Sequence, residues 1–251
     1  MESGIAIYTA DDLKLLNSFR NFSIVEISGE TLDADGIEEN LPLEYTVHVR
    51  ELLGRSIISE LPEVPFQVCR EYLKLLDKRC ETMNRLGIRL ATLTPEIGRA
   101  AADRKYADAL SSILLSIAGI CERYDIEICY ELRLPENFEN ALKLTWKFLR
   151  SSTLNRKLML DFHPHEPGSF ALLTDVAEKF PFHRDRWRIS FEVASCNYLS
   201  AEVVKRIMKV SRPGGWEKDY MIFAPGTGTD FENYSLLDKL AGECFIGANE
   251  K

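Results

Sequence analysis

The sequence predicts an α/β fold, a single (β/α)8 TIM barrel that spans residues 1–251 as one domain. Its length of 251 residues matches the size of about 250 residues that this barrel usually needs. Short runs rich in β-branched and aromatic residues alternate with longer amphipathic segments, which is typical of parallel βα units. In the second half these runs recur about every 30 residues, the length of one βα unit.

Eight segments have the composition of buried strands, and they alternate with helical patterns. They are residues 4–10, 23–28, 44–49, 88–94, 126–132, 156–162, 186–194 and 219–225. Residues 243–250 also fit a strand, which would displace 219–225 or an early strand from the barrel. We prefer 219–225 as the last strand, because the helical stretch before it fits the rhythm of the chain.

The clearest helical patterns cover residues 66–87 and 99–124. Gly87 is a natural helix stop, because glycine takes the left-handed conformation at low cost. Residues 28–43 are acidic and weakly periodic, so we expect a loop with little helix. Residues 51–65 form a long excursion, and such excursions usually shape the active-site face of a barrel.

Charge and composition exclude several classes of partner. The formal net charge of -8 argues against binding to nucleic acid or to an anionic membrane surface. There is no apolar run of about 18 residues, no secretory signal pattern and no nucleotide-binding fingerprint. None of the six cysteines forms a C-x-x-C pair, so we expect reduced thiols in a cytoplasmic protein without a nucleotide cofactor. The sequence leaves self-association into a homo-oligomer open.

Strand alternation predicts that several ionisable side chains point into the barrel, with no aliphatic plug between them. Where the aliphatic residues of a strand face the helices, the residues between them face the interior. This set comprises Glu26, His48, Glu131, Asp161 and Glu192. Burial of so many such groups costs several kcal/mol each unless they pair or bind a cation. We therefore predict a functional site at the carboxyl ends of the strands, although neutralisation by arginines or water stays open as an alternative.

Glu131 and Asp161 are the strongest pair, because they end adjacent strands with the same parity. Two such carboxylates can share a divalent cation, or they can divide into an acid and a base. The alternative is that each carboxylate pairs with an arginine, Arg133 or Arg50. These two arginines and Glu26 are also candidates for substrate binding.

Three histidines and one glycine loop complete the candidate site. His163 and His165 follow the strand of Asp161, where they could bind a metal or act as a base. His48 is a candidate catalytic residue on the third strand, together with Glu192 on the seventh. Gly226 and Gly228 lie in a loop after the last strand that could approach a substrate, although a plain turn is the alternative.

Five segments in order along the chain resemble the xylose isomerase-like barrel superfamily, which includes sugar-phosphate isomerases and epimerases. The segments are SIVEIS, YTVHV, ICYEL, LMLDFHPH and PGTGTDF. The resemblance implies a divalent metal (Mn, Mg, Co or Zn) held by Glu131 and Asp161 with His163 or His165. It also implies a second catalytic glutamate, which would be Glu250, and the seventh strand offers Ser190 and Glu192 where the family has a histidine.

These observations lead to three hypotheses of function. The first is a metal-assisted isomerase or epimerase that acts on a small sugar or sugar phosphate. The second is a metal-free lyase or hydrolase that uses the carboxylate pair. The third is a barrel that has lost catalysis and binds a ligand.

Overall fold

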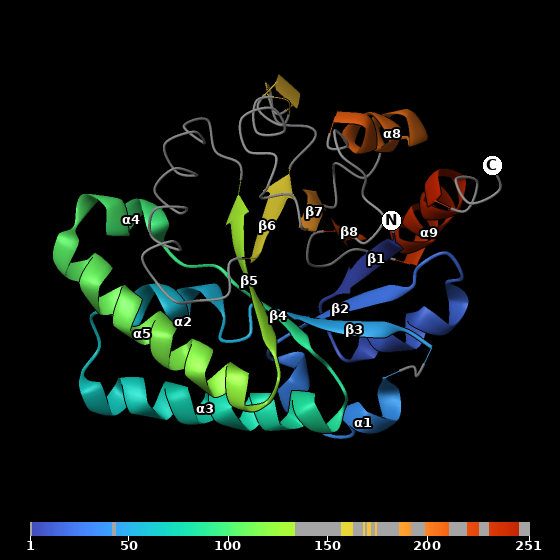
Figure 1. Ribbon diagram of the computed structural model, residues 1–251. Helices are drawn as coiled ribbons and strands as arrows, with labels where there is room; N and C mark the ends of the chain where they lie inside the picture. The colour runs from blue at the N-terminus through green and yellow to red at the C-terminus, as the bar shows by residue number, and fades with distance from the viewer. Residues whose placement is uncertain are drawn as a thin grey trace.

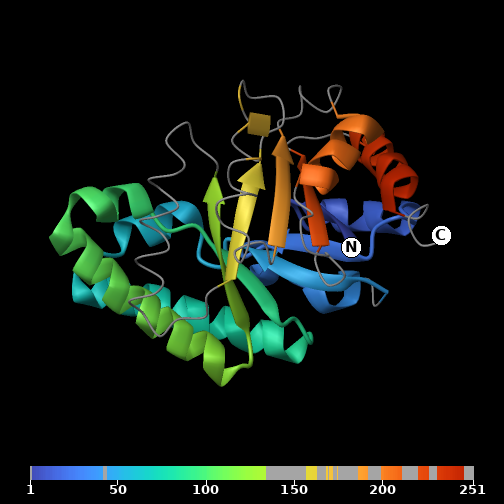
Figure 2. The same cartoon turned by 45° about the horizontal axis from the view of Figure 1, so that its top comes forward.

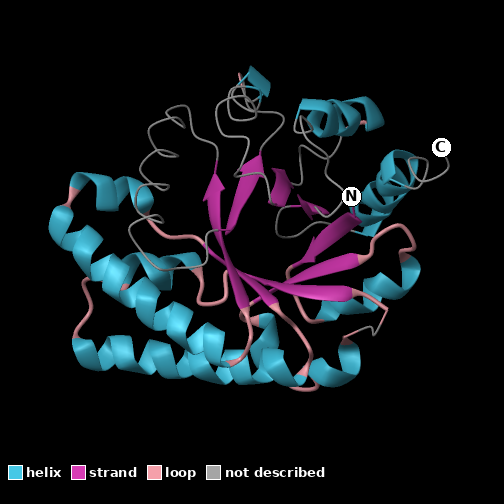
Figure 3. Cartoon of the chain, viewed as in Figure 1, coloured by secondary structure: helices cyan, strands magenta, loops and turns pink. Residues whose placement is uncertain are grey.

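Eight parallel strands form a closed barrel in the order β1 to β8, as the sequence predicts (Figure 1). The computed structural model describes residues 2–41, 44–133, 157–162, 168, 170–171, 174, 186–191, 199–210, 220–225 and 231–245. The described helices lie outside the ring of strands (Figure 3). This arrangement leaves the two ends of the barrel as the places where strand termini and loops gather.

All eight predicted strands are confirmed, with ends that move by a few residues. They are β1 (Glu2–Ile7), β2 (Ile24–Ser28), β3 (Thr46–Arg50), β4 (Leu90–Leu93), β5 (Glu127–Arg133), β6 (Lys157–Phe162), β7 (Arg186–Phe191) and β8 (Tyr220–Pro225). The alternative strand at residues 243–250 is wrong, because residues 243–245 end a helix. β8 pairs with both β7 and β1 and so closes the barrel.

The described helices range from 3 to 20 residues in length. They are the 3-10 helices η1 (Asp11–Ser18) and η2 (Thr31–Asp33), and the α-helices α1 (Ile37–Asn40), α2 (Arg55–Glu60), α3 (Phe66–Arg85), α4 (Ile97–Ala102), α5 (Arg104–Arg123), α8 (Ala201–Val210) and α9 (Phe231–Phe245). Gly87 has a φ of 72° just beyond α3, as expected for a helix stop. None of the described helices is long and apolar enough to cross a membrane.

The helix predicted for residues 99–124 is interrupted at Asp103, which separates α4 from α5. Asp103 has an extended backbone, and its carboxylate accepts hydrogen bonds from the N–H groups of Lys105 and Tyr106. An aspartate in this position satisfies the first free N–H groups of a helix. Capping by Asp103 therefore starts a new helix where periodicity alone predicts a continuous one.

The main hydrophobic core lies between the strands and the outer helices. α3 and α5 contribute Leu76, Met83, Leu110 and Ile117, all of which are fully buried. Cys80 and Cys121 also meet there, with their Sγ atoms 3.7 Å apart. The described cysteines, this pair included, form no disulfide.

α9 packs against residues 19–21, which lie between β1 and β2, and binds them through hydrogen bonds. The Asp238 carboxylate accepts hydrogen bonds from the backbone N–H groups of Arg20 and Asn21 and from the Asn21 side chain. The ring of Phe19 stacks on Phe231 and Tyr234 of the same helix. α9 and α8 lie near the N-terminus, beside the junction of β1 with β8 (Figure 2).

Candidate active site at the carboxyl ends of the strands

The inner face of the barrel carries the side chains that alternation predicts. Val25, Ile27, Val49 and Ile128 belong to the outer core, whereas Ala6, Ile24, Leu90, Cys129, Ile222 and Ala224 form a separate inner cluster. Glu26, His48 and Glu131 alternate with the outer residues, so they lie on the inner face. Their exposed fractions are 0%, 7% and 8%. These three ionisable groups are therefore buried inside the described part of the barrel.

The lower interior, near the amino ends of the strands, is packed with large aliphatic side chains. A Cβ atom on Gly4 would lie 2.3 Å from Cδ1 of Ile222 and 2.9 Å from Cβ of Ile24. The chain can pass between these two side chains only because residue 4 is glycine. The expectation of an interior without an aliphatic plug is wrong for this end, where Ile24, Leu90 and Ile222 fill the space.

The upper interior, near the carboxyl ends, is polar. In a tilted barrel, residues at one height come from alternate strands. The register of neighbouring strands is staggered along the barrel axis. When it is followed from β1 to β3 and β5, Ala6, Arg50 and Glu131 lie at the same height along this axis. Small alanines, Ala6 and Ala224, are the described aliphatic residues here, and they leave room for longer polar neighbours.

Glu131 and Asp161 occupy neighbouring strands, as predicted. Glu131 pairs in register with Met159, and Arg133 pairs with Asp161, so these four positions share one face of the sheet. The side chain of Glu131 is buried on this face. Only the backbone is described at Asp161 and Arg133, so the metal and substrate roles of these two residues stay predictions.

Several predicted site residues lie outside the described residues. They are His163, His165, Glu192, Gly226, Gly228 and Glu250. Among the residues that the structure describes, no group of three or more His, Cys, Asp or Glu side chains is arranged to hold a metal ion. The predicted ligand set falls mainly outside this part of the chain.

His48 lies in the middle of β3, two residues before the strand end. It lines a cavity of about 430 Å³ beside the start of β4, together with Gly87, Leu90 and Glu127. The stagger sets His48 below Glu131, at the height of Gly4 and Cys129. Its catalytic role stays a prediction, and its position is closer to the amino ends than we expected.

A second cavity, of about 440 Å³, opens at the carboxyl ends of β1, β2 and β3. Tyr8, Ser28 and Arg50 line it, along with loop residues that follow each strand. The guanidinium of Arg50 lies 4.5 Å from the centre of the Tyr8 ring and donates a hydrogen bond of 3.2 Å to its hydroxyl. Tyr8 was not among the predicted site residues, although it follows Gly4 and Ala6 at the spacing of inward residues.

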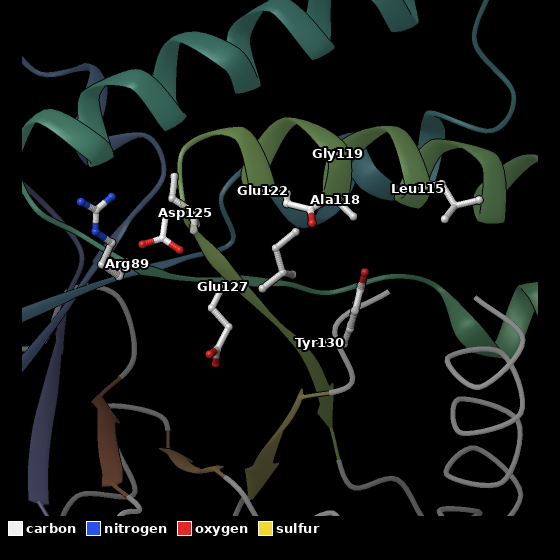
Figure 4. Close-up of a pocket in the computed structure, with 10 residues that line it drawn as sticks. Arg89, Leu115, Ala118, Gly119, Glu122, Asp125, Glu127 and Tyr130 are labelled. Carbon is white, nitrogen blue, oxygen red and sulfur yellow. The ribbon is translucent and has the colours of Figure 1, made fainter. Parts of the chain in front are cut away.

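A third cavity, about 620 Å³, lies outside the barrel wall (Figure 4). It is lined by α5 and by residues of β5 such as Ile128 and Tyr130, which face the helices. Burial raises the pKa of Tyr130 well above its ordinary value. None of the predicted site residues is among the described residues that line it, so its size does not make it the active site.

Solved structures share the fold along almost the entire chain. D-psicose 3-epimerase from Clostridium cellulolyticum H10, crystallised with D-tagatose, is 13% identical with a TM-score of 0.63, over 99% of this chain and 98% of that chain. The IOLI protein with a bound zinc atom is 13% identical with a TM-score of 0.57, over 99% and 96%. A xylose isomerase domain protein from Planctomyces limnophilus is 12% identical with a TM-score of 0.58, over 99% and 98%.

These likenesses confirm the predicted (β/α)8 barrel fold. No family model matches the chain, and no curated protein matches it. Identities near this level carry the fold alone, because one barrel supports many chemistries through different loops.

Proposed function

We propose that the protein is an isomerase or epimerase that acts on a small sugar at the carboxyl end of the barrel. The observation that carries the proposal is the burial of Glu131 on the inner face near the end of β5. A barrel built for stability alone would place an aliphatic residue there. The similarity in fold to sugar epimerases supports the same reaction class.

The proposed division of roles follows the positions of the residues. Glu131 is the principal acid and base, with His48 and Glu192 as further proton carriers. Asp161, His163 and His165 join Glu131 as metal ligands. The residues assigned to substrate binding are Glu26, Arg50, Arg133, Gly226 and Gly228.

The donor set fits a divalent metal in kind. Carboxylate oxygens from Glu131 and Asp161 with a histidine nitrogen suit Mn, Co or Zn, and carboxylates alone suit Mg. When bound, such an ion would polarise the carbonyl and hydroxyl groups of a sugar. The IOLI protein, which shares the fold, was crystallised with zinc.

The protein's own groups would move the proton. An isomerase or epimerase removes a proton from the carbon beside a carbonyl group and returns it to another position or face. A carboxylate within hydrogen-bond reach can perform both steps, and Glu131 has the required chemistry. Because Glu131 is buried, bulk water has limited access to compete for the same proton.

Proton exchange tests this proposal directly. Purified protein is incubated in D2O with D-fructose or D-tagatose, with and without MnCl2, and NMR follows deuterium at the carbons beside the carbonyl. We expect exchange by the wild type and a loss of at least about a hundredfold in Glu131→Gln, the scale of a missing general base. Glu127→Gln is the matched control, because Glu127 lies on the same strand near its amino end.

The two other hypotheses correspond to different outcomes. Exchange or bond cleavage that survives a chelator would support a metal-free lyase or hydrolase, and elemental analysis of Asp161→Asn would then match the wild type. Sugar binding without any exchange would support a barrel that has lost catalysis. Equal exchange rates in Glu131→Gln and Glu127→Gln would contradict the proposal.

A further inference from the structure

The cavity at the ends of β1, β2 and β3 is built from a planar cation and several carboxylates. Arg50 and Tyr8 form one wall, and Asp12, Glu30 and Glu51 also line it. Among its described contacts, the Arg50 guanidinium gives one N–H to the Tyr8 hydroxyl. Because arginine has five N–H donors, this wall can donate further hydrogen bonds into the cavity.

Contacts with Thr92, Arg79 and Gly29 fix the position of the loop that contains Glu51. The N–H groups of Glu51 and Leu52 donate to the side chain and the carbonyl of Thr92, each at 3.0 Å. The Leu52 carbonyl accepts a hydrogen bond of 2.6 Å from Arg79, which is almost fully buried. A Cβ atom on Gly29 would lie 2.6 Å from that same carbonyl oxygen.

This packing holds Glu51 in an unfavourable backbone conformation. Its φ of 48° is left-handed, which few non-glycine residues adopt. Arg79, which donates to the Leu52 carbonyl, also binds the Asp33 carboxylate through two of its nitrogens, so its own position is fixed. Strain retained in a tightly supported loop is common where a side chain must be held for binding.

The charge balance of the cavity selects among ligands. Among the described residues of the lining, Asp12, Glu30 and Glu51 are acidic and Arg50 is the basic one. In this described lining a phosphate group would meet three carboxylates and one guanidinium, so like-charge repulsion opposes its entry. A neutral polyol instead offers hydroxyls that donate to the carboxylates and accept from Arg50.

We infer that this cavity is a subsite for the uncharged, hydroxyl-bearing end of the substrate, with Arg50 and Glu51 as its specificity-determining residues. The inference rests on the proposed function and narrows its substrate class from sugars and sugar phosphates to neutral sugars. Arg79 is a positioning residue, because it acts on the cavity through the backbone of Leu52.

The test compares binding of D-fructose and D-fructose 6-phosphate by ligand-observed NMR. The wild type should bind D-fructose at least about tenfold more tightly than its phosphate. Arg50→Ala should weaken D-fructose binding about tenfold, the effect of losing a charged hydrogen-bond partner. Arg55→Ala is the control, because Arg55 pairs with Glu96 and does not line the cavity.

A second variant removes a carboxylate without disturbing the loop. Glu51→Asn keeps a residue that tolerates the left-handed conformation, so folding should be preserved. It should weaken D-fructose binding several-fold without weakening that of the phosphate. Asp125→Asn is its matched control, because Asp125 also has a positive φ, 57°, and lies at the turn before β5.

Each outcome separates this inference from the proposed function. Tighter binding of the phosphate, no binding of either sugar, or equal effects of Arg50→Ala and Arg55→Ala would overturn the subsite. Proton exchange that needs Glu131 and ignores Arg50 would overturn the subsite alone. D-fructose binding that needs Arg50, without proton exchange, would support the subsite and contradict the enzymatic proposal.

Discussion

The two ends of the barrel interior use the same strands and the same side-chain alternation for different purposes. Near the amino ends, Ile24 and Ile222 pack so closely that β1 needs Gly4 between them, and Leu90 belongs to the same cluster. Near the carboxyl ends, alanines stand beside Arg50 and Glu131. Aliphatic packing stabilises a barrel, whereas buried charges cost free energy unless they are used or paired. The change from one to the other along the strands marks where the site begins.

Glu26 and His48 are the exceptions in the lower half, since both are buried there on the inner face. They lie in register with each other on β2 and β3. Together they extend the polar inner surface from the carboxyl ends toward the middle of β2 and β3. The contrast between the two ends is therefore strongest at β1, β4 and β8.

Substitution of Gly4 should give the largest effect on stability. Gly4→Val introduces side-chain atoms into space held by Ile222 and Ile24, and we expect a loss of at least about 3 kcal/mol in the free energy of unfolding. Denaturant titration measures it. A loss below about 1 kcal/mol would mean that the lower interior is not tightly packed.

Substitution of Arg79, which supports the Glu51 loop, should give the next largest effect on stability. Arg79→Met removes the ion pair with Asp33 and the hydrogen bond to Leu52 from a buried position, so we expect a loss of about 2–4 kcal/mol. Because the Glu51 loop would also lose its support, D-fructose binding should weaken. Arg123→Met is the control, since its ion pair with Asp77 is exposed and is worth under about 1 kcal/mol. Unchanged sugar binding in Arg79→Met would contradict the positioning role.

A truncation within the plug should separate stability from function. Ile24→Ala should cost about 2–4 kcal/mol through the cavity that it leaves. Proton exchange by the folded fraction should nevertheless stay within about threefold of the wild type, because Ile24 lies below the polar layer. Proton-exchange rates measured well below the unfolding temperature check this. A large loss of rate in Ile24→Ala would contradict the separation of the barrel interior into a stabilising half and a functional half.

The smallest effect concerns alkaline pH. Burial, and then the charges of Glu44 and Asp238, raise the pKa of Tyr45 in the folded state. The stability from this shift is complete below the unfolded pKa of about 10 and is lost as pH rises through the folded value. Tyr45→Phe should therefore be less stable than the wild type at neutral pH, because it lacks the hydroxyl's hydrogen bonds to the carbonyls of Leu16 and Phe19. Above pH about 10, its free energy of unfolding should fall less steeply with pH than that of the wild type. Parallel pH profiles of the two proteins would contradict this.

Periodicity predicted the strands and the inner face because both are local properties of the sequence. The break at Asp103 was not predicted, since a capping aspartate inside an amphipathic pattern changes no periodicity. The plug was missed because Gly4, Ile24 and Ile222 are far apart in sequence and meet only through the stagger of the strands. The stacking of Arg50 on Tyr8 depends on the same stagger, so its parts are visible in the sequence but their contact is not.

Glu131→Gln, with unfolding free energy and proton exchange measured on the same samples, tests the central claim most directly. A functional residue in the polar half should leave the free energy of unfolding within about 1 kcal/mol of the wild type while abolishing exchange. A loss of more than about 3 kcal/mol with exchange retained in the folded fraction would show that Glu131 is structural, and the division of the barrel would be wrong.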